Sequence, residues 1–165
     1  MISKKIQTAI NKQINMEFYS AYLYLSISAY FDSIHRTGFA NWMKLQAQEE
    51  LSHGMKIYDY LLDQEGEVGL ATVKAPPAMW KSPLAACQDA LKHERANTKM
   101  INELVTLASS ENDHATRIFM QWFVEEQVEE VATASTLVEK VRLAKDDSGA
   151  FFILDNELGQ RQLTE

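Results

Sequence analysis

Four long segments of the sequence carry apolar side chains at alternating spacings of four and three residues. This spacing is the a/d pattern of packed α-helices, because residues three and four apart share one face of a helix. The apolar positions are Ile10, Ile14, Ala21, Tyr24, Phe31; Phe39, Met43, Ala47, Ile57, Leu61; Leu84, Cys87, Leu91, Ile101, Val105, Ala108; and Met120, Phe123, Ala134, Leu137, Val141, Ala144. The pattern predicts a bundle of four long helices.

Capping residues and helix breakers set the expected ends of these helices. The expected helices cover Ser3 to about Ile34, Phe39 to Glu65, Ser82 to the polar turn 109–113, and from that turn to Ala144, with a short fifth helix at 150–154. Ser3 and Ser82 are capping residues, and Pro83 suits a first helical turn. Gly38 and Gly66 are expected to break the chain, and residues 145–149 to end the fourth helix. The polar C-terminal residues are expected to lack fixed structure.

The segment 67–82 is expected to be a long connection between the second and third helices. It contains Gly69, Pro76 and Pro77 and has no helical period. A connection of this length is unusual in a compact domain and is typical of a crossover that spans a helical bundle. At 165 residues, the chain is expected to form one domain over residues 1–165.

Composition excludes several classes of function. The formal net charge is −7 and the basic residues form no stripe, so we expect no nucleic-acid partner. The longest uncharged stretch, 18–31, is too short for a membrane span, and the N-terminus lacks an apolar signal core. The single cysteine, Cys87, suits a reducing compartment. These features predict a soluble, cytoplasmic, acidic protein.

One carboxylate interrupts each apolar face: Glu17, Glu50, Glu94 and Glu130. If the first helical hairpin turns near residue 36, Glu17 faces the region of residue 55, close to His53. If the second hairpin turns near residue 111, Glu94 faces the region between Gln127 and Glu130. The polar residues are therefore expected to meet at matching levels within each hairpin.

Each of these residues has an ordinary explanation when considered alone. A single glutamate on an apolar face is most often paired or reaches solvent, and a single histidine or tyrosine such as His53 or Tyr24 commonly packs in a core. Together, four unpaired carboxylates would repel one another, and no lysine or arginine lies on the four faces to neutralise them. Bound cations resolve this conflict. Oxygen-rich ligation with one imidazole suits iron or manganese better than zinc, and a carboxylate shared between hairpins indicates two metal ions.

The chain resembles the bacterial non-haem ferritins along essentially its whole length. The resembling residues are Glu17 with Tyr24, the run Glu50-Leu51-Ser52-His53, Glu94, and Gln121-Trp122 followed by the run from Glu126 to Glu130. The resemblance implies an all-α, ferritin-like four-helix bundle with a long crossover between the second and third helices and a short fifth, C-terminal helix.

The resemblance also implies roles for individual residues at a di-iron centre. It assigns Glu17, Glu50 and His53 to the first iron, with Glu50 bridging both ions. It assigns Glu94 and Glu130 to the second iron, with Gln127 beside it. Tyr24 resembles a tyrosine near the centre that acts as an electron donor or hydrogen-bond partner.

A third iron site is implied next to the first two. Glu49, Glu126 and Glu129, together with Glu130, resemble its ligands. A solvated acidic face remains the alternative for the first three of these residues. Trp122 lies in the resembling segment as a redox-active or packing residue.

The implied function is iron storage with ferroxidase activity, in which dioxygen or peroxide oxidises Fe(II) and the ferric product mineralises inside a 24-subunit cage. Haem is not expected, because Leu51 stands where haem-containing bacterioferritins place a methionine. Helices three and four also lack a second Glu-x-x-His, since Asn97 and Glu130 stand at the positions for the histidines.

Two other classes of protein remain open. One is a ferritin-like oxidase or peroxidase that stores no mineral. Such proteins commonly add a Cys-x-x-Cys domain, and this chain has one cysteine. The other is a metal-free helical scaffold, for which leucine would serve better than glutamate at the four matched positions.

Overall fold

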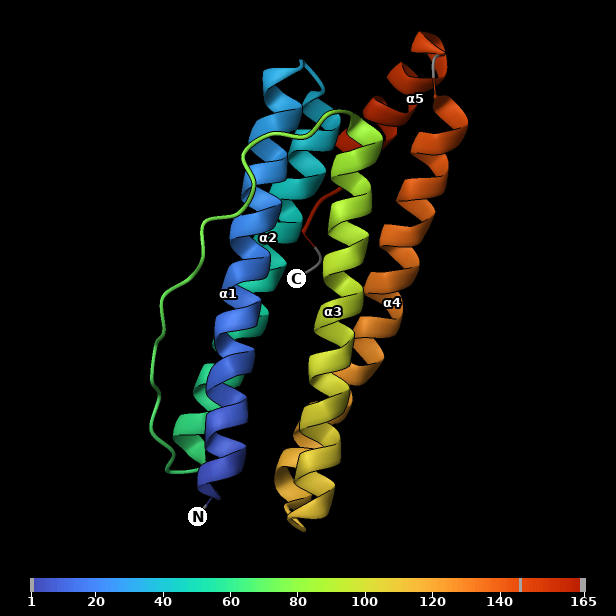
Figure 1. Ribbon diagram of the computed structural model, residues 1–165. Helices are drawn as coiled ribbons and strands as arrows, with labels where there is room; N and C mark the ends of the chain where they lie inside the picture. Colours follow the sequence, from blue (N-terminus) through green and yellow to red (C-terminus); the bar gives the residue numbers. More distant parts are fainter. Residues whose placement is uncertain (1, 146, 164–165) are drawn as a thin grey trace.

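The computed structural model describes residues 2–145 and 147–163. The described chain forms five helices: α1 (Lys4–Ser33), α2 (Thr37–Asp63), α3 (Pro83–Ser110), α4 (His114–Ala144) and α5 (Ser148–Gly159). The first four are long and run side by side, and α5 is short and lies at one end of the bundle (Figure 1). The prediction of a four-helix bundle with a fifth, C-terminal helix is confirmed.

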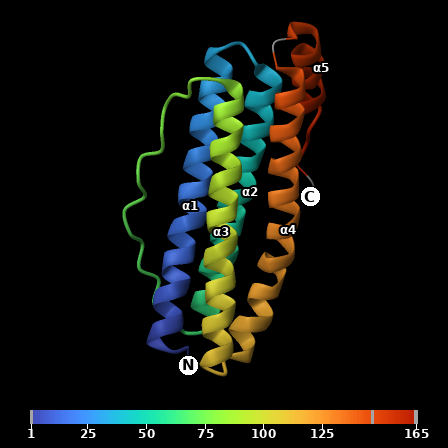
Figure 2. The ribbon, with the colours of Figure 1, turned by 45° about the vertical axis from the view of Figure 1, so that its right-hand side comes forward.

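The connection between α2 and α3 determines the topology. It leaves α2 at the end of the bundle near the N-terminus and runs along the outside of α1 to the opposite end, where α3 begins (Figures 1 and 2). Consequently α2 and α3 run in the same direction, while α1 with α2 and α3 with α4 form antiparallel hairpins. The hairpins meet where α1 packs on α3, and α5 packs on α2 and α4. The predicted crossover is confirmed.

Short polar side chains cap three of the four long helices at their N-termini. Ser3 Oγ accepts a hydrogen bond from the amide of Ile6 at 3.3 Å, and Ser82 Oγ accepts one from Ala85 at 3.1 Å. An Asp113 oxygen accepts from the amide of Thr116 at 2.9 Å. Each cap satisfies an amide that has no partner within its helix, which explains why these helices begin where they do.

Gly38 does not break the chain, contrary to the sequence-based expectation. It lies in the first turn of α2 and is buried. A Cβ atom at this position would lie 1.7 Å from the backbone oxygen of Asp155. The glycine therefore serves the close approach of α5 to α2, and α2 begins at Thr37 rather than Phe39.

The end of α2 also differs from the expectation. The helix ends at Asp63 and not at Glu65, and Glu65 rather than Gly66 adopts a positive φ, of 56°. The Gly66 amide donates to the backbone oxygen of Leu61 at 2.9 Å, and a Cβ on Gly66 would meet the Leu61 side chain at 2.4 Å. The Gly66 amide thus satisfies a terminal carbonyl of α2, and the glycine leaves room for the Leu61 side chain.

Smaller corrections concern the remaining boundaries. The first helix ends at Ser33, one residue before Ile34, and α3 continues through Ser109 and Ser110, so the turn is only 111–113. The fifth helix covers Ser148–Gly159 and is longer than 150–154, because Asp147 caps it by accepting from Gly149 and Ala150. Beyond α5, Arg161 contacts Asn41, Trp42, Gln46 and Glu49 of α2, whereas Gln162 and Leu163 are exposed. Asp146, Thr164 and Glu165, for which a break and a polar end were expected, lie outside the described residues.

The apolar core consists of two clusters that lie on either side of a polar layer. One cluster contains residues such as Tyr24, Phe31 and Phe39, and the other contains residues such as Ile14 and Ile57. Between these clusters in the sequence of α1 lies Glu17, which is fully buried. None of the five described helices combines the length and apolarity needed to cross a membrane.

Candidate metal centre

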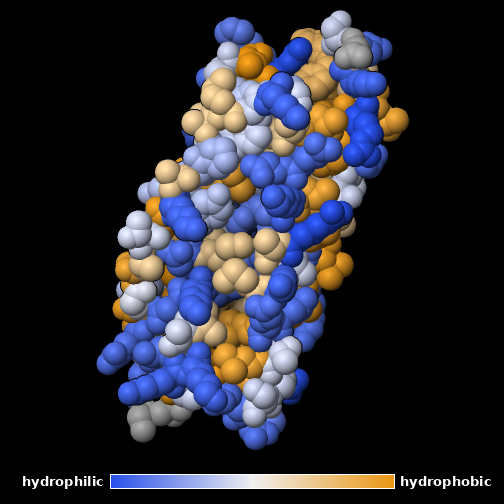
Figure 3. Space-filling view, viewed as in Figure 1, coloured by the Kyte–Doolittle hydropathy of each residue, from blue (hydrophilic) through white to orange (hydrophobic). Residues whose placement is uncertain are grey.

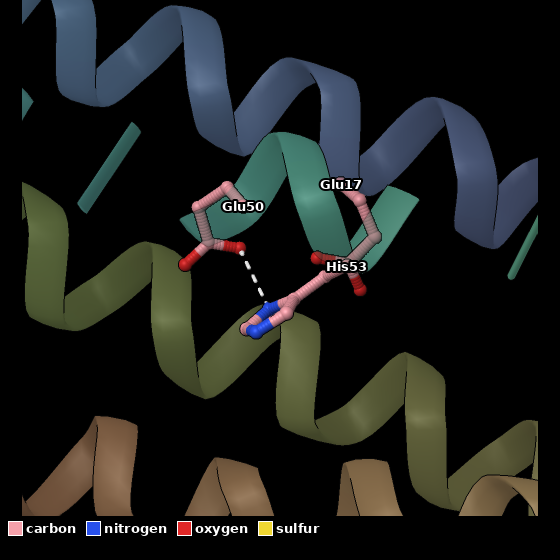
Figure 4. A group of neighbouring side chains, drawn as sticks. All are labelled: Glu17, Glu50 and His53. Atoms are coloured by element: carbon pink, nitrogen blue, oxygen red, sulfur yellow. Dashed lines mark ion pairs between the residues drawn. The ribbon is translucent and has the colours of Figure 1, made fainter. Parts of the chain in front are cut away.

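The first part of the polar layer joins α1 and α2. Glu17, Glu50 and His53 each offer one ligand atom, and these atoms lie within 4.8 Å of one another. Glu50 and His53 share a face of α2 because they are three residues apart, and Glu17 approaches them from α1 (Figure 4). The Nδ1 atom of His53 lies 3.7 Å from Oε2 of Glu50. The predicted meeting of Glu17 with His53 is therefore confirmed.

The second part of the layer joins α2 to the other hairpin. Oxygen atoms of Glu50, Glu94 and Glu130 also lie within 4.8 Å of one another. Glu94 comes from α3 and Glu130 from α4, so three helices contribute to this group. Glu50 belongs to both groups. A single carboxylate therefore stands between the two possible cation positions.

Burial and mutual repulsion raise the pKa values of the carboxyl groups in the centre. Burial raises the pKa of Glu17, and the charge of Glu50 raises it further. Burial likewise raises the pKa of Glu50, with added repulsion from Glu94 and Glu130. For Glu130, burial first and then Glu94 raise the pKa to about 7. In the absence of cations, the centre therefore holds protons that carboxyl groups in water would lose.

The donor set fits hard or intermediate divalent cations. Among the described residues, no lysine or arginine is buried, so no side-chain cation within the core neutralises the centre. The Oε2 atom of Glu50 is buried and has no hydrogen-bond partner among the described residues, since the 3.7 Å separation from His53 is too long for one. An unsatisfied carboxylate oxygen at the shared position is what a bound cation would satisfy.

Amide side chains support the carboxylates, and the sequence reasoning missed this role. Gln13 Nε2 donates to Glu17 Oε1 and to Asn97 Oδ1, both at 2.6 Å. Asn97 Nδ2 lies 3.3 and 3.4 Å from the two oxygens of Glu17. Asn97, which stands where a second Glu-x-x-His would place a histidine, thus links α3 to a ligand candidate on α1.

Gln46 provides the corresponding support on the other side of the centre. Its Nε2 atom donates to Glu130 Oε2 at 2.7 Å and to Glu50 Oε1 at 3.2 Å. Gln13 and Gln46 each precede a buried glutamate by four residues, which is one helical turn. That spacing was a signal in the sequence by which both amides could have been found.

Tyr24 and Gln127 both contact Glu94, in agreement with their expected place beside the centre. The Tyr24 hydroxyl donates to Glu94 Oε1 at 2.5 Å. Gln127 Nε2 donates to the backbone oxygen of Glu94 at 3.1 Å, to its Oε2 at 3.3 Å and to Thr98 Oγ1 at 3.0 Å. These contacts hold the Glu94 carboxylate from two directions.

Trp122 packs against the imidazole of the centre. Its ring lies 5.3 Å from that of His53, at an interplanar angle of 79°. Trp122 also contacts Lys56, whose ammonium lies 3.2 Å from the centroid of the Trp122 ring in a cation–π arrangement. Trp122 is therefore one contact away from the ligand candidates and partly exposed to solvent.

The residues proposed for a third site do not form a three-ligand group. Within residues 2–145 and 147–163, the two groups whose ligand atoms lie within 4.8 Å of one another contain neither Glu49 nor Glu126 nor Glu129. Glu49 is paired with Arg161 at 2.5 Å, Glu126 is half-buried and Glu129 is exposed. Glu49 lies close enough to Glu130 to raise its pKa.

Comparison with known proteins agrees with this geometry. The family model of the ferritin-like domain matches residues 7–144, which include all of the ligand candidates described above. The chain belongs to the ferritin family. A bacterial non-heme ferritin from Bacteroides fragilis is 45% identical over 161 residues, covering 98% of this chain and all of the relative. One from Staphylococcus epidermidis is 38% identical, covering 100% of this chain and 99% of that protein.

Solved ferritins have the same fold. An open-pore ferritin from the archaeon Archaeoglobus fulgidus superposes with a TM-score of 0.97 at 52% identity and covers 98% of this chain. A form of that ferritin engineered to be closed gives a TM-score of 0.98 and covers 99%. Both solved chains are covered completely. Family membership gives this ferritin the function of iron storage with oxidation of Fe(II).

Proposed function

We propose that this ferritin oxidises Fe(II) at a di-iron centre made by Glu17, Glu50, His53, Glu94 and Glu130. The observation that carries the proposal is the pair of buried ligand groups that share Glu50. In this assignment, Glu17, Glu50 and His53 bind one Fe(II), while Glu50, Glu94 and Glu130 bind the other. Charge supports it as well, because Fe(II) substrates would neutralise carboxylates that no buried lysine or arginine meets among the described residues.

The reaction removes one electron from each of two Fe(II) ions. Dioxygen can accept these two electrons with two protons to give hydrogen peroxide, and peroxide can accept them with two protons to give water. Carboxylates favour the product, because negatively charged oxygen ligands stabilise Fe(III) more than Fe(II). The protein supplies the ligand positions and the charge, and the ions supply the redox chemistry.

The surrounding hydrogen bonds position the ligands for this reaction. Gln13 and Asn97 orient Glu17, Gln46 orients Glu50 and Glu130, and Tyr24 and Gln127 orient Glu94. Such outer partners typically change metal affinity or activity about 10- to 100-fold when they are removed. The hydrogen bond from the Tyr24 hydroxyl to Glu94 also supports the role of electron donor that the family resemblance implies for Tyr24.

We propose a third iron site at Glu49, Glu126, Glu129 and Glu130, which would accept iron next to the di-iron centre. The closeness of Glu49 to Glu130 supports it. A solvated acidic face is the alternative, and the exposure of Glu129 favours that alternative for this residue.

Storage requires a closed shell, and we propose the 24-subunit cage of the family. The names of the solved relatives, an open-pore ferritin and an engineered closed form, support a shell with pores. Apolar patches interrupt the polar surface of the single chain (Figure 3). Exposed apolar residues include Tyr22, Leu25, Ile118, Leu143, Phe152 and Ile153. Exposure of this kind is typical of surfaces that subunits cover on assembly.

Iron content after aerobic addition of Fe(II) tests the proposal. Storage predicts an assembled particle that retains far more than two iron atoms per chain. Retention of about two per chain would instead indicate a di-iron oxidase or peroxidase without storage, and retention of none would indicate a scaffold. If Fe(II) added to the assembled, initially metal-free protein were not oxidised quickly, that result would contradict the proposed centre.

A further inference from the structure

Arg161, near the end of the described residues, contacts α2 beside the carboxylate centre. Arg161, two residues beyond α5, has its side chain on α2 and its backbone oxygen 3.3 Å from Asn41 Nδ2. Its guanidinium lies 4.5 Å from the Trp42 ring centroid and donates to the backbone oxygen of Trp42 at 3.4 Å. These contacts occupy a face of α2 that leads directly to Gln46 and Glu49.

Arg161 reaches the centre through an amide whose orientation it determines. Its Nη1 atom lies 2.9 Å from Oε1 of Gln46. A guanidinium only donates hydrogen bonds, so the Gln46 atom facing it must be the oxygen. The amide NH₂ therefore points to Glu50 and Glu130, the two carboxylates to which it donates.

The same guanidinium also forms an ion pair with Glu49. Its Nη2 atom lies 2.5 Å from Glu49 Oε2, and both side chains are about three-quarters buried, with exposures of 22% and 25%. Arg161 thus provides a positive charge on the side of the centre where Glu49 approaches Glu130. A metal cation that binds Glu49 competes with this guanidinium for the negative charge of the carboxylate, because Nη2 already lies at hydrogen-bond distance from Oε2.

We propose that Arg161 is a tethered competitor for cations at Glu49, so that binding of iron beyond the di-iron centre requires release of the C-terminal segment. The inference rests on the proposed function, because it concerns the third site beside that centre. Arg161 neutralises Glu49 while no such cation is bound, and it keeps Gln46 oriented toward the bridging carboxylate. By linkage, a cation that displaces Arg161 also removes the contacts by which this residue joins α2.

Titration of the metal-free, assembled protein tests the proposal. Anaerobic Fe(II), and separately redox-inert Zn(II), are added to wild type, Arg161→Gln and Arg142→Gln while heat release is measured. Arg142 is the matched control, because its partner Glu139 lies on the exposed face of α4. Because Arg161 also orients Gln46, we expect the first two equivalents to bind no more tightly in Arg161→Gln than in wild type, whereas a further equivalent binds about threefold more tightly in Arg161→Gln only.

A conservative variant and a second measurement separate competition from loss of packing. Arg161→Lys restores a tethered cation, so its affinity for the further equivalent is expected to return toward that of wild type. Hydrogen–deuterium exchange of the C-terminal peptide is expected to rise in wild type when the further equivalent binds. Equal binding in Arg161→Gln and Arg142→Gln, or an Arg161→Lys variant that matches Arg161→Gln, would overturn the inference alone. Failure of wild type to bind the first two equivalents would overturn the proposed function and the inference with it.

Discussion

Glu50 is the residue on which both halves of the centre depend. Within the part of the chain that the structure describes, it is the one carboxylate common to the two ligand groups, and Gln46 donates to one of its oxygens while the other has no hydrogen-bond partner. We predict that Glu50→Ala lowers the initial rate of Fe(II) oxidation at least about a hundredfold while the cage still assembles. Stopped-flow absorbance measures the rate, with Glu103→Ala, on an exposed part of α3, as the control. Oxidation at the wild-type rate in Glu50→Ala would refute the assignment.

Glu126 and Glu129 distinguish a third iron site from a solvated acidic face. Neither residue belongs to the two buried ligand groups, so replacing either with alanine is predicted to leave the initial oxidation within about twofold of wild type. If they bind iron, the later phase changes, namely the ratio of iron oxidised to oxygen consumed and the time before the centre is ready again. Fe(II)-soaked crystals provide the direct check. Wild-type behaviour in both phases, without a third anomalous peak near Glu49 and Glu126, would leave the solvated face as the explanation.

The raised pKa of Glu130 predicts how the stability of the metal-free protein depends on pH. Its pKa is raised from 4.5 to about 7 in the fold, mainly by burial, so the folded chain retains a proton that the unfolded chain has lost. The folded state binds more protons between these values, and its stability therefore falls as pH rises through this window. Glu130→Gln removes the buried charge and is predicted to raise stability at pH 7.5 by about 1–3 kcal/mol, with little change at pH 4. Calorimetric melting of metal-free protein at both pH values measures this, and an equal shift at both would contradict it.

At the scale of helices, the close packing of α5 on α2 depends on one glycine. A methyl group at Gly38 would overlap the backbone of Asp155, whose side chain also accepts a hydrogen bond from the amide of Phe39 at 3.0 Å. Backbone atoms cannot rotate away, so Gly38→Ala is predicted to destabilise the protein by about 1–3 kcal/mol. Gly69→Ala is the control, since a Cβ there meets nothing within 4 Å. Equal melting temperatures for the two variants would show that α5 does not need this approach.

For the whole molecule, the prediction that separates this ferritin from a haem-containing relative concerns Leu51. The residue lies next to Glu50 on α2 and is 50% exposed, and its side chain offers no atom that can ligate haem iron. We predict that the purified assembly carries no stoichiometric haem. Visible absorption spectroscopy tests this prediction. A Soret band that persists through purification at about one haem per pair of subunits would overturn it.

The amino-acid sequence alone was sufficient for the bundle and for the level of its polar layer. Apolar spacings of three and four define one face of each helix, and this local property holds before any tertiary contact forms. Because antiparallel hairpins bring predictable levels together, Glu17 could be matched with His53, and Glu94 with Gln127, without coordinates. Their roles as iron ligands remain predictions drawn from family resemblance.

Only the tertiary structure decided which distant segments meet. Gly38 reads as a helix break in sequence, yet its role is the approach of α5, more than a hundred residues away along the chain. Asn97 donates a hydrogen bond to Glu17, and Arg161 donates to Gln46 and Glu49. These hydrogen bonds join segments that no helical period relates. A periodic pattern reports the face of one helix, whereas these contacts depend on how whole elements pack, so they emerged only when the elements were seen together.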